Sequence, residues 1–78
     1  ITFFLELDAE PGLLSGVLIT IAYYHGNILT VHQSIPINGI ASLTLSVQIL
    51  PAQGDAEAMV AEIEHIEGVH YLKILGRE

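Results

Sequence analysis

Cysteine is absent from the sequence, which excludes a disulfide framework and any metal site with thiolate ligands. On this ground we expect a cytoplasmic protein. A chain of 78 residues that folds alone buries only roughly 60% of its unfolded surface, and no covalent staple supports this one. Because 51% of the residues are nevertheless apolar, we expect a homodimer or higher homo-oligomer whose subunits bury the surplus apolar surface together.

Positive charge is almost absent as well. Lys73 and Arg77 are the only basic residues against nine acidic ones, which gives a formal net charge of -7 at pH 7. Binding to nucleic acid requires a basic patch that this chain cannot form, and an anionic membrane surface is disfavoured for the same reason. Long apolar runs are missing too: the longest, residues 12–24, is shorter than the ~20 residues that a transmembrane helix needs.

No basic segment precedes this apolar run, so no signal peptide is visible in the sequence. The chain starts at Ile1 rather than at Met, within an alternating strand pattern. We therefore expect residues 1–78 to form a single domain, either excised from a longer chain or left after cleavage of a tag.

The first half of the sequence predicts a strand, a helix and a second strand. Residues 1–7 alternate between two faces, one of them apolar, which is typical of a strand. Apolar residues then recur at helical spacing up to Ile21, and we expect Gly26 to take the left-handed conformation that ends the helix. Residues 27–37 are expected to form the second strand.

Asn38 and Gly39 are a strong signal for a two-residue hairpin, because both central residues of a type I′ turn need a positive φ. A third strand follows at once, in which apolar residues alternate with small polar ones up to Ile49. The segment PAQGD, residues 51–55, then interrupts the pattern and ends in Asp55, the expected N-cap of a second helix. Gly68 ends this helix, and the residues from Val69 to Leu75 predict a last strand.

The expected order βαββαβ predicts an α+β, ferredoxin-like sandwich, in which both helices cover one face of a four-stranded antiparallel sheet. The other face stays uncovered, and the small polar residues of the third strand suit it. Open edge strands invite uncontrolled pairing, which a second copy of the chain would prevent. The side chains expected in the core are Leu5, Leu7, Leu14, Val17, Leu18, Ile21, Leu45, Val47, Met59, Val60 and Ile63.

The stretch LDAEPGLLSGVL, residues 7–18, and the later HGNI, residues 25–28, resemble the signature of ACT domains, small regulatory modules that bind amino acids. The resemblance covers the whole chain and implies the same βαββαβ order. More narrowly, NILTVHQSIPINGIASLTLS, residues 27–46, and GVHYLKILGRE, residues 68–78, resemble the C-terminal ACT domain of PheB-type proteins, which are associated with phenylalanine biosynthesis. In that group a helical segment precedes the domain.

The turn before the first helix has features of an anion site. Pro11 fixes its own φ, Gly12 lets a ligand approach the backbone closely, and the N–H groups at the start of a helix attract a carboxylate. Asp8 and Glu10 are candidates to meet the ammonium group of the same amino acid. The alternative is that Asp8 caps the helix and that Pro11 and Gly12 form an ordinary turn.

Asn27 is a second candidate, because its side chain both donates and accepts hydrogen bonds and can hold both ends of a zwitterion. The resemblance implies that this position lies near a loop of a neighbouring subunit. The alternative is that Gly26 and Asn27 form a helix cap and turn. The full set of candidate ligand-binding residues is Asp8, Ala9, Glu10, Pro11, Gly12, Leu13, Leu14, Asn27 and Ile28.

Metal binding and catalysis are not expected. The four histidines lack the spacing of a zinc pair on one helix, and the acidic residues lack a calcium-binding loop, so we expect no metal or other cofactor. PheB-type proteins have been labelled chorismate mutase, but that reaction rearranges a dianion and needs several converging cations. Lys73 and Arg77 alone cannot supply them, and no nucleophile motif is present. We therefore expect no enzymatic activity.

Two functions remain. The first is a regulatory domain that senses an amino acid, by the resemblance an apolar or aromatic one, at a subunit interface. The second is a purely structural dimerisation module that binds no ligand.

Overall fold

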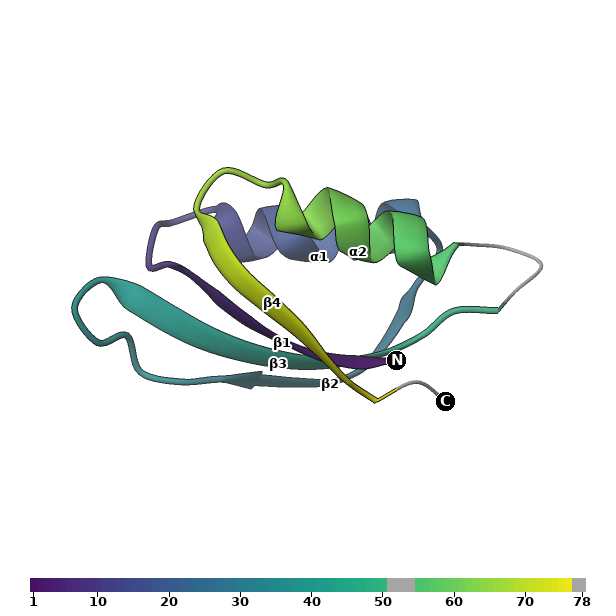
Figure 1. The fold of residues 1–78 in the computed structure, drawn as a ribbon, viewed down its shortest axis with the longest axis horizontal. Helices are drawn as coiled ribbons and strands as arrows, with labels where there is room; N and C mark the ends of the chain where they lie inside the picture. Colours follow the sequence, from purple (N-terminus) through teal and green to yellow (C-terminus); the bar gives the residue numbers. More distant parts are fainter. Residues whose placement is uncertain (51–54, 77–78) are drawn as a thin grey trace.

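The computed structural model describes residues 1–50 and 55–76. Its elements follow the predicted order βαββαβ, with both helices on one face of a four-stranded antiparallel sheet (Figure 1). The ferredoxin-like prediction is therefore confirmed. The elements are β1 (Thr2–Asp8), α1 (Leu13–Tyr23), β2 (Asn27–Gln33), β3 (Ile40–Gln48), α2 (Ala56–Glu64) and β4 (Val69–Gly76).

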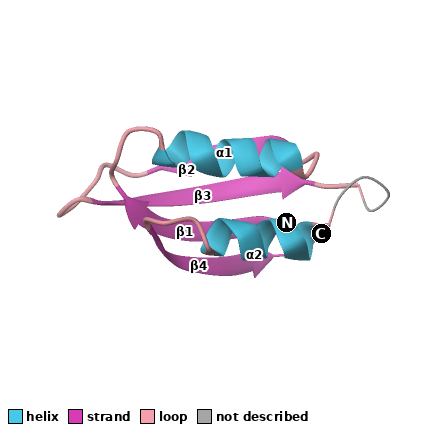
Figure 2. Cartoon of the chain, turned by 90° about the horizontal axis from the view of Figure 1, so that it is seen from above, coloured by secondary structure: helices cyan, strands magenta, loops and turns pink. Residues whose placement is uncertain are grey.

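The strands lie in the order β2-β3-β1-β4, so that β1 and β3 are central and β2 and β4 form the edges. β1 pairs antiparallel with both of its neighbours. Seen from above, α1 lies over the β2–β3 side of the sheet and α2 over the β1–β4 side (Figure 2). The β1–α1 turn and the β2–β3 hairpin meet at one end of the molecule, where the N–H of Ala9 donates to the carbonyl oxygen of Gly39.

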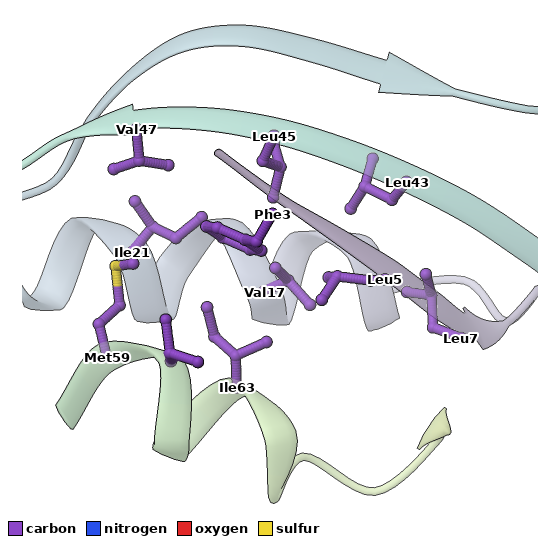
Figure 3. Close-up of a cluster of buried hydrophobic side chains, with 11 residues drawn as sticks. Phe3, Leu5, Leu7, Val17, Ile21, Leu43, Leu45, Val47, Met59 and Ile63 are labelled. Atoms are coloured by element: carbon purple, nitrogen blue, oxygen red, sulfur yellow. The ribbon is translucent and has the colours of Figure 1, made fainter. Parts of the chain in front are cut away.

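The core lies between the sheet and the helices (Figure 3). Every predicted core residue is buried except Leu14 and Leu18, which are half-buried and pack against the core from its border. Both belong to the side of α1 that faces β2 rather than α2, because Leu14 shares a cavity with Gln33 of β2 and Leu18 lies one helical turn further on. Phe3, Ala41 and Leu43 are also buried and were missing from the predicted core.

The prediction for the end of α1 is wrong in one respect. His25, with φ 61°, takes the left-handed conformation, and Gly26 does not. Gly26 is needed for a different reason: a Cβ atom at this position would lie 2.6 Å from Cγ2 of Ile21 and 2.8 Å from Cγ1 of Val47. The glycine therefore allows the chain leaving α1 to pass directly over the core.

The second strand is shorter than predicted. β2 ends at Gln33 instead of continuing to Ile37. Pro36 carries no backbone N–H and cannot take part in a regular ladder, and beyond it Ile37 forms an isolated bridge with Ile40. The turn itself is as predicted, since Asn38 has φ 54° and Gly39 has φ 78°.

The start of α2 also agrees with the sequence. Asp55 is the N-cap, and its Oδ1 accepts hydrogen bonds from the backbone N–H groups of Glu57 at 3.0 Å and Ala58 at 3.3 Å. The preceding residues of the predicted chain break, 51–54, lie outside the described residues, as does Arg77.

Gly26 and Gly16 provide a matched pair of substitutions. Gly26→Ala should lower the free energy of unfolding by about 1–3 kcal/mol, because the added methyl group overpacks the core. Gly16 lies inside α1, and a Cβ there has nothing within 4 Å, so Gly16→Ala should be neutral or stabilise the fold by about 0.5–1 kcal/mol. Urea denaturation measures both values. Equal effects of the two substitutions would contradict the packing role of Gly26.

Candidate functional site

The turn between β1 and α1 is fixed in place by hydrogen bonds to two other loops. The N–H of Asp8 donates to the carbonyl oxygen of Gly68 at 2.8 Å, and the N–H of Ala9 donates to that of Gly39 at 2.8 Å. Within the turn, the N–H of Leu13 donates to the carbonyl oxygen of Glu10 at 3.2 Å. The turn is therefore held between the β2–β3 hairpin and the segment that leads into β4.

The N-terminus of α1 has no side-chain cap. Its N-cap residue is Gly12, which takes the left-handed conformation with φ 87°, so that a residue with a Cβ would be strained there. By contrast, Asp55 caps α2 with its carboxylate. The alternative in which Asp8 caps the first helix is therefore wrong. First-turn N–H groups have no partner within the helix itself, and the positive end of the helix dipole favours an anion at this point.

A cavity of about 260 Å³ lies beside this turn. Its wall comes from the end of β1, the turn, α1, the residues around the end of β2, and the start of β3. Apolar residues dominate it, and Asp8, Glu10 and Gln33 are the polar exceptions. The lining residues are Leu7, Asp8, Ala9, Glu10, Pro11, Leu14, Gln33, Pro36, Ala41 and Leu43. This composition, apolar with a few polar groups, is typical of sites for small molecules.

The structure brings most of the predicted site residues together. Those that line the cavity are Asp8, Ala9, Glu10, Pro11 and Leu14. Gly12 and Leu13 are not part of the lining. Leu13 instead lies against Gly68, because a Cβ atom added to Gly68 would be 2.8 Å from Cδ2 of Leu13.

Asn27 and Ile28 lie away from the cavity. They start β2 and pair with Gln48 and Val47, whereas the cavity contacts Gln33 at the other end of the same strand. Ile28 packs against the core, and Asn27 is exposed. Within one copy of the chain these two residues are therefore not part of the same site as Asp8.

His70 does not line the cavity, but it contacts the predicted site residue Asp8 in a way that the sequence did not reveal. Its Nε2 lies 2.6 Å from Oδ1 of Asp8, and both side chains are partly exposed. The pairing of β1 with β4 shifts its register between Glu6 and Leu7, which places His70 beside the end of β1. Because 62 positions separate the two residues, no local sequence pattern could have indicated this contact.

Gln33 and Pro36 were also missed as lining residues, because the prediction treated them as part of a continuous strand. Among residues 1–50 and 55–76, no three His, Asp or Glu side chains gather as a metal site would require. Neither described helix is long and apolar enough to cross a bilayer.

Comparison with known proteins places this geometry in context. No protein-family model matches the chain. It is 58% identical over all 78 residues to a UPF0735 ACT domain-containing protein of Lachnoclostridium phytofermentans, covering 53% of that protein. It is 41% identical, again over all 78 residues, to a protein of the same description from Caldicellulosiruptor saccharolyticus, covering 52% of it. The chain thus spans about half the length of these curated relatives.

A solved structure that is also described as an ACT domain has a similar fold. The crystal structure of the ACT domain from GTP pyrophosphokinase of Chlorobium tepidum superimposes with a TM-score of 0.74, covering 92% of this chain and 91% of that one, at 14% sequence identity. At this identity the likeness concerns the fold alone. The chain is thus similar along its whole length to part of two ACT domain-containing proteins, and it shares the fold of a solved ACT domain.

Proposed function

We propose that this chain is a regulatory domain that binds an amino acid in the cavity beside the β1–α1 turn. The observation that carries the proposal is a mainly apolar cavity beside a helix start that lacks a side-chain cap. Asp8, before the turn, and Leu14, after it, both belong to the lining of this cavity.

Each part of an amino acid has a counterpart in this arrangement. The carboxylate of the ligand suits the N–H groups of the first turn of α1, and the ammonium group suits Asp8 and Glu10. The side chain of the ligand would lie against Leu7, Leu14 and Leu43, which line the cavity and have apolar side chains. An apolar or aromatic amino acid is therefore favoured over a charged one.

A second copy of the chain would complete this site. β2 is an edge strand, and its Val31 is 45% exposed although its register partner Leu45 is buried under the helices. The half-buried Leu14 and Leu18 lie on the same side of the molecule. Pairing of two β2 strands would cover these apolar side chains and remove an open edge.

The same pairing gives Asn27 a function. In an antiparallel pair of β2 strands related by a two-fold axis, the start of one strand lies opposite the end of the other. Asn27 of the partner subunit would then approach Gln33, which lines the cavity. A ligand held by Asp8 of one subunit and by the partner's Asn27 would stabilise one arrangement of the dimer and so influence any attached domain.

The structural alternative remains open as a second proposal. The exposed apolar side chains of β2 and the hairpin, among them Leu29, Val31 and Ile35, favour self-association with or without a ligand. The narrower resemblance to PheB-type proteins, with its link to phenylalanine biosynthesis, and a cytoplasmic location also belong to the proposal.

Thermal unfolding in the presence of each of the twenty amino acids at millimolar concentration tests ligand binding. At 100 times its dissociation constant, a ligand adds ~2.7 kcal/mol to the stability of the fold, and we expect an apolar or aromatic amino acid to do so. Asp8→Asn should remove most of the shift, whereas Glu67→Gln, an equal change of charge outside the cavity lining, should retain it. If none of the twenty raises Tm, the structural alternative is favoured.

Analytical ultracentrifugation at micromolar concentration tests the dimer. The expected mass is twice the 8.4 kDa of one chain. Val31→Glu should shift it toward the monomer, because a carboxylate would enter the β2 contact. Leu75→Glu makes the same kind of change at an exposed apolar residue of the opposite edge strand and should leave the dimer intact. A wild-type mass near 8.4 kDa that persists as the concentration rises would contradict the proposed interface.

A further inference from the structure

The outward face of α1 is unusual for a helix that covers a core. Its sequence, LLSGVLITIAY, contains no charged residue, whereas a helix at the surface of a globular domain normally carries polar and charged residues opposite its buried stripe. Ile19 is 69% exposed and Tyr23 is 74% exposed. They lie four positions apart, on one face of the helix, and together form an exposed apolar strip.

The neighbouring helix has the opposite character. α2 and its N-cap carry the acidic residues Asp55, Glu57, Glu62 and Glu64, all of them exposed, and neither helix contains lysine or arginine. Lys73 belongs to β4, where it pairs with Phe4 of β1 and faces away from the helices. The helical layer of the described residues therefore combines an apolar strip with a band of negative charge.

A shallow cleft of about 340 Å³ joins these two features. Its lining consists of Ile19, Thr20, Tyr23, Tyr24 and Glu62. The rings of Tyr23 and Tyr24 meet edge to face, with centroids 5.2 Å apart. Partial burial, followed by the nearby charge of Glu62, raises the pKa of Tyr24.

A cation in this cleft would find two kinds of partner. The carboxylate of Glu62 offers a charge-assisted hydrogen bond, and the tyrosine rings offer their electron-rich faces. Glu62 lines the same cleft as Ile19 and Tyr23, so its charge lies at the border of the apolar strip. The cleft thus suits a lysine or arginine that lies next to an apolar side chain.

We propose that the α1–α2 face binds a basic amphipathic helix of another protein. Its apolar side chains would pack on Ile19 and Tyr23, and a lysine or arginine on its flank would reach Glu62. Recognition of a helix through apolar anchors spaced three or four residues apart is a common mode of binding to such a surface.

The charge of this face argues against a second copy as its occupant. Two copies that met through their helical layers would bring α2 against the acidic residues of its counterpart, and neither helix would supply a cation. Like charges placed together in an interface are unfavourable. An anionic lipid surface is disfavoured for the same reason.

The face is also separate from the amino-acid cavity. At 100° per residue, Tyr23 lies on the opposite side of α1 from Leu14, which lines the cavity. Both surfaces are therefore free to be occupied at once, and this inference does not depend on the proposed function.

Fluorescence anisotropy with two synthetic 18-residue peptides tests the inference. One peptide places leucine at helical i, i+3 and i+4 spacing with lysine elsewhere, and the other replaces each lysine with glutamate. At 150 mM salt, we expect the lysine peptide to bind and the glutamate peptide not to bind. Tyr23→Ser and Glu62→Gln should each weaken binding roughly tenfold, since a buried anchor or a charged hydrogen bond contributes about 1.4 kcal/mol or more.

Two control variants separate specific docking from attraction to a protein of net charge -7. Glu67→Gln removes one charge from an exposed residue outside the cleft, and Leu75→Ser removes an exposed apolar side chain from β4. Both should bind within about twofold of the wild type, with Tm confirming that every variant is folded. Absence of binding, equal binding of both peptides, or equal weakening by the controls would overturn the proposal. A lower sedimenting mass for Tyr23→Ser would also overturn it, because the face would then be a contact between copies of this chain.

Discussion

The central position of β1 is the constraint on which the site depends. β1 pairs with β3 on one side and β4 on the other, and its residues Phe3, Leu5 and Leu7 are buried beneath the helices. The strand can neither slip by one residue nor bend away without exposing this apolar face. Its end is therefore fixed, and the hydrogen bonds of Asp8 to Gly68 and of Ala9 to Gly39 extend that order into the turn. The uncapped start of α1 is thus presented by a rigid support, as a binding site requires.

A second constraint is the amount of apolar surface. Among residues 1–50 and 55–76, the core holds twelve buried hydrophobic residues, but large apolar side chains also remain exposed on β2, on the hairpin and on the outward face of α1. These exposed groups form two regions with different electrostatic surroundings. The β2 side lies beside the cavity and is the proposed contact with a second copy, whereas the α1 face borders acidic α2 and is the proposed contact with a basic partner. The two proposals thereby concern separate surfaces.

Local chemistry explains which parts of the fold could be predicted from the sequence. The alternation in β1 and β3, the Asn38–Gly39 turn and the cap at Asp55 depend on neighbours in the chain, and the structure agrees with all of them. Gly26 was identified as special but for the wrong reason, because its close contact with Val47 of β3 arises only in the folded chain. The early end of β2 reflects Pro36, whose effect on pairing outweighed the strand propensity of its isoleucine neighbours.

In the candidate site, too, local features could be predicted from the sequence, whereas contacts between distant residues could not. The residues from Asp8 to Leu14 are contiguous, so their turn was predictable. Gln33, which lines the cavity, and His70, which contacts Asp8, come from distant strands and are positioned by the sheet. The sequence correctly predicted that Asn27 starts β2. Its separation from the cavity within one chain follows from the direction and length of β2, because only Gln33 at the far end of this strand lines the cavity. Asn27 can therefore belong to the site only if a second subunit supplies it. The position of a second subunit can be read neither from sequence patterns nor from the structure of a single chain.

The most direct measurement is a two-dimensional ¹⁵N–¹H NMR titration of the labelled chain with the amino acid that most raises Tm. The account predicts that the backbone N–H signals of Gly12, Leu13 and Leu14 and the side-chain amide of Asn27 shift together with one dissociation constant. Such coincidence means that the start of α1 and the start of β2, which are apart in one chain, meet in the same ligand site of the dimer. Shifts that spare residues 12–14, or that affect them without Asn27, would contradict the shared site.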